Sequence, residues 1–239
     1  MHTGKKTLFA LAALSLAATG YSQSTNKWEK SAALGLTLTR GNSETLLLTA
    51  DAQATKKWTE DELALGASVS YGEDHSVKNN EALKGLAQWN HLFSERFYGY
   101  AHVDALHDAV ADVEYRVTLS PGAGYYFIKQ ANMNLSAEAG PGVVFEKQGG
   151  VDKTYLTARV AEKFDYKLND RARVWESVEF LPQVDNFDNY IINAEVGAEA
   201  SLTKKTALRV VLQDTFDNQP APGRKKNDLK LVTSVVVKF

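Results

Sequence analysis

The chain has 239 residues, of which 29 are acidic and 27 are basic, so its formal net charge is −2. This balance argues against a nucleic-acid partner, which needs a clustered basic surface. The chain contains no cysteine, which excludes disulfides and cysteine-based metal or catalytic sites.

The first 22 residues have the pattern of an export signal. Lys5 and Lys6 supply a charged start, residues 7–18 are mostly apolar, and small residues follow within 19–22. The apolar run of about a dozen residues is shorter than the ~20 that a membrane helix needs. We therefore expect a signal peptide over residues 1–22, removed on export, and one mature domain over residues 23–239.

From residue 31 onward the chain repeats segments in which apolar and polar residues alternate, the two-residue period of a β-strand. About twelve such segments are expected, an even number with lengths that suit membrane-barrel strands of ~9–11 residues. They run over residues 31–39, 45–57, 62–72, 81–91, 97–107, 115–127, 133–146, 155–167, 172–183, 190–202, 206–216 and 229–239.

The connections between these segments are expected to alternate in length, with short periplasmic turns and longer outer loops. The expected outer loops cover residues 73–80, 108–114, 147–154, 185–189 and 217–228. The first outer connection, residues 40–44, is the exception, because Gly41-Asn42 suits a tight hairpin.

Aromatic residues gather at both ends of the predicted strands, as in the girdles of membrane barrels. One set adjoins short turns or the C-terminus, and the other adjoins long loops: Trp58, Trp89, Phe97, Phe127, Tyr166 and Phe239 in the first, and Tyr71, Phe145, Phe180 and Phe216 in the second. This placement favours an all-β, antiparallel, up-and-down transmembrane β-barrel of about 12 strands over the alternative of a soluble β-sandwich.

The last segment ends on an aromatic residue after alternating apolar ones, with Val235, Val237 and Phe239 on one face. This ending resembles the C-terminal signal that an assembly machine reads in bacterial outer-membrane barrels. We therefore expect localisation in the bacterial outer membrane. The expected partners are outer-membrane lipid, the barrel assembly machinery and periplasmic chaperones, and the sequence predicts no oligomeric state.

The face that the alternation turns inward carries seven acidic and seven basic residues. They are Asp51, Lys84, Asp104, Arg116, Glu138, Arg159, Lys163, Asp165, Arg173, Glu179, Glu195, Glu199, Arg209 and Lys230. Hairpin geometry predicts four opposed pairs across neighbouring strands: Asp104 with Arg116, Arg159 with Glu179, Asp165 with Arg173, and Glu199 with Arg209. These pairs form either a ladder that braces the wall or the lining of a weakly selective channel that orients polar solutes.

Glu162 and Glu176 fall on the outward, lipid-facing parity, and the same hairpin places them opposite each other. A carboxylate in lipid is costly, and a pair of like charges more so. We expect a β-bulge to turn one or both inward. A cation-binding or proton-binding pair at a subunit contact is the alternative.

Catalytic motifs are missing from the sequence, which has no HExxH, GxSxG or phosphate-binding glycine loop. We expect no metal, no cofactor and no catalytic residues. The alternative is an outer-membrane, protease-like hydrolase with an Asp/His site near the outer rim, built from His102, Asp104, His107 and Asp108.

Three stretches carry a family resemblance: residues 35–45 (GLTLTRGNSET) followed by Lys57-Trp58, residues 116–125 (RVTLSPGAGY) and residues 163–171 (KFDYKLNDR). They resemble the uncharacterised family labelled salt-induced outer-membrane protein, domain-of-unknown-function family 481. The resemblance implies an outer-membrane β-barrel of a Gram-negative bacterium associated with salt response, and it supplies no substrate. The sequence thus predicts a narrow, weakly selective, porin-like channel or an envelope-structural protein linked to salt stress.

Overall fold

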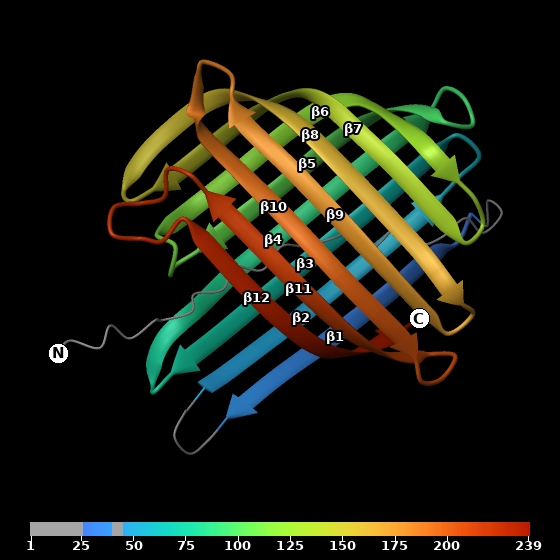
Figure 1. The fold of residues 1–239 in the computed structure, drawn as a ribbon, viewed down its shortest axis with the longest axis horizontal. Coiled ribbons are helices and arrows are strands. Elements are labelled where there is room, and N and C mark those ends of the chain that lie inside the picture. Colours follow the sequence, from blue (N-terminus) through green and yellow to red (C-terminus); the bar gives the residue numbers. More distant parts are fainter. Residues whose placement is uncertain (1–25, 40–44) are drawn as a thin grey trace.

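The computed structural model describes residues 26–39 and 45–239, which form a closed barrel of twelve strands (Figure 1). The strands are β1 (Trp28–Thr39), β2 (Thr45–Lys57), β3 (Asp61–Asp74), β4 (Val77–Leu92), β5 (Phe97–Asp108), β6 (Val113–Lys129), β7 (Met133–Gln148), β8 (Val151–Asn169), β9 (Ala172–Gln183), β10 (Asn186–Ser201), β11 (Thr206–Asp217) and β12 (Asn227–Lys238). The predicted signal peptide and first outer connection lie outside the described residues.

Each strand pairs antiparallel with its neighbours in the chain, and β12 closes the barrel by pairing with β1. The predicted all-β fold, the up-and-down topology and the number of twelve strands are confirmed. Closure pairs the two terminal strands with each other, which removes the open edges that a sheet would otherwise expose. No helix among the described residues is long and apolar enough to cross a membrane.

Side chains alternate between an apolar outer face and a polar inner face along each strand. In β11, for example, Leu208 and Leu212 are exposed on the outside, whereas Arg209, Gln213 and Thr215 are buried inside. A soluble protein buries its apolar residues, so this reversed distribution is the one a lipid-embedded barrel requires. The buried interior is the lumen, and it is lined mainly by charged and hydroxyl side chains.

The two ends of the barrel differ less in loop length than the sequence predicts. The end with Phe239 and the turns at residues 93–96, 130–132, 170–171 and 202–205 is called the inner end, and the opposite end the outer end. At the outer end, strands β7 and β8 continue to a turn at Gly149 and Gly150, both with positive φ. The prediction of long outer loops is therefore mostly wrong, because most of the polar residues assigned to them belong to extensions of the neighbouring strands. Among the outer connections that the structure describes, the β11–β12 connection is the one that stays long.

The seam between β1 and β12 is paired over five residues on each strand, from Ser31 opposite Lys238 to Gly35 opposite Ser234. By contrast, β1 and β2 pair over twelve residues. Within the described residues, the outer halves of β1 and β12 form no pairs with each other. The seam is thus the weakest line in the wall.

Candidate functional site

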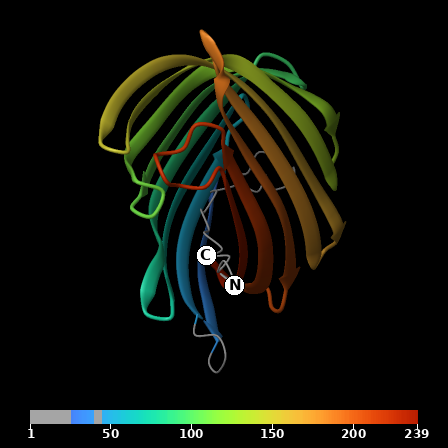
Figure 2. The same ribbon diagram turned by 60° about the vertical axis from the view of Figure 1, so that its left-hand side comes forward.

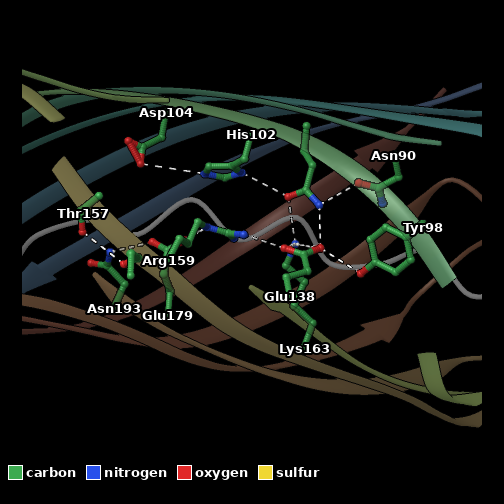
Figure 3. A network of polar contacts seen from close by, with 12 residues as sticks. Asn90, Tyr98, His102, Asp104, Glu138, Thr157, Arg159, Lys163, Glu179 and Asn193 are labelled. Carbon is green, nitrogen blue, oxygen red and sulfur yellow. Dashed lines mark hydrogen bonds and ion pairs between the residues drawn. The ribbon is translucent and has the colours of Figure 1, made fainter. Parts of the chain in front are cut away.

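The centre of the lumen is held by the guanidinium of Arg159 on β8. Its Nη1 lies 2.7 Å from Glu138 Oε2 on β7, and its Nε lies 2.5 Å from Glu179 Oε2 on β9 (Figure 3). The guanidinium also lies over the Tyr100 ring, 5.2 Å from the ring centroid. Arg159 is therefore fixed on both sides of its own strand and from β5, and it has little freedom to leave this position.

Two hydrogen bonds extend this network across the lumen. Gln88 on β4 donates to Glu138 Oε1 at 2.7 Å, and Lys163 on β8 donates to Gln88 Oε1 at 3.0 Å. Strands β4 and β8 are four positions apart in the twelve-strand ring, so the contact between Gln88 and Lys163 spans the lumen between two non-adjacent parts of the wall. Tyr98 on β5 adds a hydrogen bond to Glu138 at 3.0 Å. The result is a central layer of polar side chains that narrows the lumen.

A second layer of contacts crosses the lumen near the outer end. Arg116 on β6 places Nε 2.6 Å from Glu146 Oε2 and Nη2 3.0 Å from Asp217 Oδ2. Gln148 on β7 donates to the same Asp217 carboxylate at 3.1 Å. Because β6 and β11 are five positions apart in the ring, Asp217 is tied to nearly the opposite wall.

The β11–β12 loop, residues 218–226, continues from Asp217 over the outer opening. Ala221 in this loop is buried, and a Cβ on Gly149 in the β7–β8 turn would lie 3.2 Å from Pro222 Cδ. The loop therefore lies beside the β7–β8 turn, four strands round the ring from its own hairpin. In Figure 2 it is the red loop that extends from the ends of β11 and β12. Together with the bond between Arg116 and Asp217, it covers part of the outer entrance.

The inner end holds a third charged cluster around Glu199 on β10. Its carboxylate lies 2.7 Å from Lys238 Nζ, 2.8 Å from Arg209 Nη2 and 3.3 Å from Arg173 Nη2. The guanidinium groups of Arg173 and Arg209 both lie over the Trp175 ring, at 5.0 and 5.8 Å. This cluster lies along the wall instead of across the lumen, and beside it is a cavity of about 490 Å³ that includes Phe239 in its lining.

The four predicted charge pairs differ in outcome. Glu199 lies opposite Arg209, as predicted. The other three registers are wrong: Asp104 faces Thr118 and Asp165 faces Trp175, while Ala161 occupies the place opposite Glu179 that was predicted for Arg159.

Two of the misregistered pairs nevertheless meet diagonally. Arg159 binds Glu179 at 2.5 Å, and Arg173 Nη1 lies 3.8 Å from Asp165 Oδ2. Asp104 and Arg116 do not meet, because Arg116 is held by Glu146 and Asp217 instead.

Glu162 and Glu176 both stay on the outward parity. The prediction of a β-bulge is wrong, because the β8–β9 register runs without a shift from Thr157 to Lys167. Nor do the two lie directly opposite each other, since Glu162 faces Val178 and Phe164 faces Glu176. They are diagonal neighbours on the outer face.

The predicted Asp/His site does not converge. His102 is buried in the lumen, where its Nδ1 lies 3.1 Å from Gln88 Oε1 and its Nε2 lies 3.9 Å from Asp104. His107 is exposed on the outer face with Nδ1 2.8 Å from the Glu114 carbonyl, and Asp108 accepts backbone N–H bonds. In the described part of the chain, no group of three or more His, Asp or Glu side chains is placed to hold a metal ion.

Several residues of the bridging layers escape the sequence reasoning. Gln88 is neutral, so a search for charges passes over it, and Asp217 falls in a segment predicted as loop. Glu146 stands at the end of a predicted strand with inward parity, and this parity was the available signal for it. Nothing in the sequence indicates which strands face each other across the lumen.

Comparison with known proteins places the chain in a family. A model of the family described as "Protein of unknown function, DUF481" matches residues 32–239. The chain belongs to this family. No curated protein matches the DUF481 chain.

Solved structures similar to this DUF481 protein include porins. The NanC porin has 6% identity and a TM-score of 0.54, with 89% of this chain and 100% of that chain covered. The KdgM porin has 9% identity and a TM-score of 0.50, with 88% and 99% covered, and the same values hold for the KdgM porin in complex with disordered oligogalacturonate. The DUF481 protein therefore has a porin-like outer-membrane β-barrel fold.

Proposed function

We propose that this DUF481 protein is a narrow, weakly selective channel for small polar solutes in the outer membrane of a Gram-negative bacterium. The observation that carries the proposal is the division of a polar lumen by two cross-lumen layers, one around Gln88, Lys163 and Glu138 and one around Arg116 and Asp217. Cavities remain between and beside these layers. A barrel filled only for stability would have no reason to keep them.

The size of these cavities supports small solutes. The cavity between the two layers measures about 140 Å³ and the outer one about 110 Å³, against about 490 Å³ at the inner end. A solute crossing the barrel must displace or slip past side chains at both layers. The channel is therefore expected to pass small solutes slowly and to exclude larger ones.

The charges of the central layer support weak ion selectivity. Glu138 and Glu179 are matched by Arg159 and Lys163, so the narrow part carries no net charge. Selectivity for cations or anions in a pore follows the sign of the side chains that ring it. A lumen of opposed charges instead orients polar solutes.

The alternative is an envelope-structural barrel that does not conduct, with its charge pairs serving only to brace the wall. The family resemblance links either version to salt stress. Impaired growth in high salt after deletion of the gene, restored by the intact chain, would support that link.

Swelling of liposomes that contain the purified protein separates the two versions. The channel proposal predicts swelling in arabinose, slower swelling in sucrose and none in raffinose. Replacing both Gln88 and Lys163 by alanine should remove the central bridge and admit sucrose faster, whereas Lys78→Ala, exposed at the outer rim, should change nothing. Absence of swelling in every solute and variant would leave only the structural barrel.

A further inference from the structure

The cavity between the two bridging layers is lined by several charged residues, most of which are paired within those layers. Lys84 and Asp104, on neighbouring strands, are not among those ion pairs. Lys84 on β4 lies opposite Leu106 on β5, and Asp104 on β5 lies opposite Leu86 on β4, so the two charged residues are diagonal neighbours on the lumen face. Both line the cavity of about 140 Å³. No ion pair joins them in the described part of the chain.

Lys84 has no hydrogen-bond or ion-pair partner among the described residues. Of the other carboxylates near it, Glu195 accepts hydrogen bonds from Trp175 and Gln213. Asp108 accepts the backbone N–H groups of residues 110 and 111 with Oδ1, while its Oδ2 is buried without a hydrogen-bond partner and forms no ion pair with Lys84. An ammonium group buried in a narrow lumen is costly without a partner. A ligand carboxylate would supply one.

Asp104 is the complementary group. It accepts a hydrogen bond from Thr118, and no lysine or arginine of the described chain lies within ion-pair distance. His102 Nε2, at 3.9 Å, is its nearest basic atom. About 30% of the Asp104 side chain is exposed, so its carboxylate can accept a ligand ammonium group.

Part of the opposite wall of the cavity is apolar, beside the charged and polar side chains that β8, β9 and β10 also contribute. Leu181 and Ile191 are buried there, on β9 and β10, and Ala161 on β8 adjoins them. Leu86 and Leu106 continue the apolar surface beside the two charges. The cavity thus places Lys84, without an ion-pair partner, and Asp104, without a lysine or arginine partner in the described chain, next to an aliphatic surface within a small volume.

We propose that this cavity binds a small zwitterion, an α-amino acid with an aliphatic side chain. Its carboxylate binds Lys84, its ammonium group binds Asp104, and its side chain packs on Leu181 and Ile191. A simple anion bound to Lys84 would leave Asp104 without a partner and next to another negative charge. A simple cation bound to Asp104 would leave Lys84 without a partner and next to another positive charge. Only a ligand with both charges satisfies both groups. An amino acid would then be the solute class of the proposed channel. Its passage through the barrel rests on the proposed channel function, whereas its binding in the cavity does not.

Calorimetric titration of the full mature protein in detergent tests the site with three probes: leucine, 4-methylpentanoate, which lacks the ammonium, and 3-methylbutylamine, which lacks the carboxylate. We expect leucine to bind at least about tenfold more tightly than either analogue, since each lost partner is a charge-assisted hydrogen bond. Equal binding of all three, or no binding of leucine, would overturn the proposal. This series uses the unaltered chain, so it does not depend on the folding of a variant.

Variants then assign the two roles. Lys84→Met should weaken leucine binding about tenfold but leave the binding of 3-methylbutylamine unchanged. Asp104→Asn should likewise weaken leucine binding about tenfold but leave the binding of 4-methylpentanoate unchanged. Lys238→Met, in the inner cluster, is the matched control and should alter neither. Exchange of the two groups, Lys84→Asp with Asp104→Lys, should restore leucine binding in the reversed orientation. Undiminished binding in both single variants would contradict the site. Binding without liposome swelling would remove the channel and keep the site.

Discussion

Arg116 and Asp217 join two walls of the barrel that the chain order keeps far apart, with Nη2 and Oδ2 separated by 3.0 Å. Asp217 is the last residue of β11, and the long β11–β12 loop begins directly after it. The same carboxylate therefore closes the outer layer of the lumen and fixes the loop that covers the mouth.

Glu199 is expected to be the most important charge for stability at the inner end. Its side chain is 2% exposed and neutralises Arg173, Arg209 and Lys238. Glu199→Gln would leave the buried guanidinium of Arg209 without a carboxylate partner and should lower the free energy of unfolding by about 3–5 kcal/mol, measured by urea unfolding in lipid vesicles. The control is Glu29→Gln, at the exposed start of β1, with a change below about 0.5 kcal/mol. Similar values for both would contradict this role.

The outward glutamates should behave in the opposite way. Glu162→Gln removes a carboxylate from the lipid-facing wall and from the neighbourhood of Glu176, so it should raise the free energy of unfolding in bilayers by about 1–2 kcal/mol. Glu138→Gln, in the lumen, should lower it, because Glu138 binds Arg159. A loss of stability in Glu162→Gln would indicate that the two glutamates bind a cation or a partner.

Phe239 is expected to act in assembly more than in the folded wall. The residue is 77% exposed, and its backbone N–H donates to the Lys30 carbonyl at 2.9 Å. Phe239→Asp should reduce the amount of folded protein in outer membranes severalfold, judged by heat-modifiable mobility in gels. Phe93→Asp, a girdle residue that is 64% exposed near an inner turn, is the control. Equal losses would show that Phe239 is only a girdle aromatic.

The seam between β1 and β12 should be the most dynamic part of the wall. Beyond Gly35 and Ser234 the two strands form no described pairs, and unpaired backbone groups are costly in lipid. Amide hydrogens of residues 36–37 and 231–233 that point toward the seam should exchange faster than those between β2 and β3. A disulfide between Leu36→Cys and Thr233→Cys, opposite each other if the register continued, should slow this exchange. Uniform protection without the disulfide would contradict an open seam.

The twelve strands and their inward faces were predictable because alternation is a local signal that each strand repeats. The register between neighbouring strands was harder to predict from the sequence. The prediction for Asp165 and Arg173 placed the centre of the turn at Asn169, but the observed register centres it one residue later, which shifts every pair by two. The Asn169 side chain accepts the N–H groups of residues 171 and 172, and this turn geometry sets the register.

The cross-lumen contacts were not predictable from one sequence. Gln88 meets Glu138 across 50 residues and Arg116 meets Asp217 across 101. Which strands approach across the lumen depends on the shape of the closed barrel, and no local pattern encodes that shape. The strand ends were also missed at the outer side, because polar residues beyond the membrane pair as strands without apolar alternation.

Single-channel recording in planar bilayers tests the central claim most directly, that a conducting lumen is narrowed by contacts across it. The intact protein should give small steps, and Asp217→Asn, which weakens the tie to Arg116, should give larger or longer-lived ones. Lys147→Met, which removes an exposed ion pair with Glu114 that does not cross the lumen, should match the intact protein. Absence of steps in all three proteins at every salt concentration, or identical steps in Asp217→Asn and the intact protein, would contradict the account.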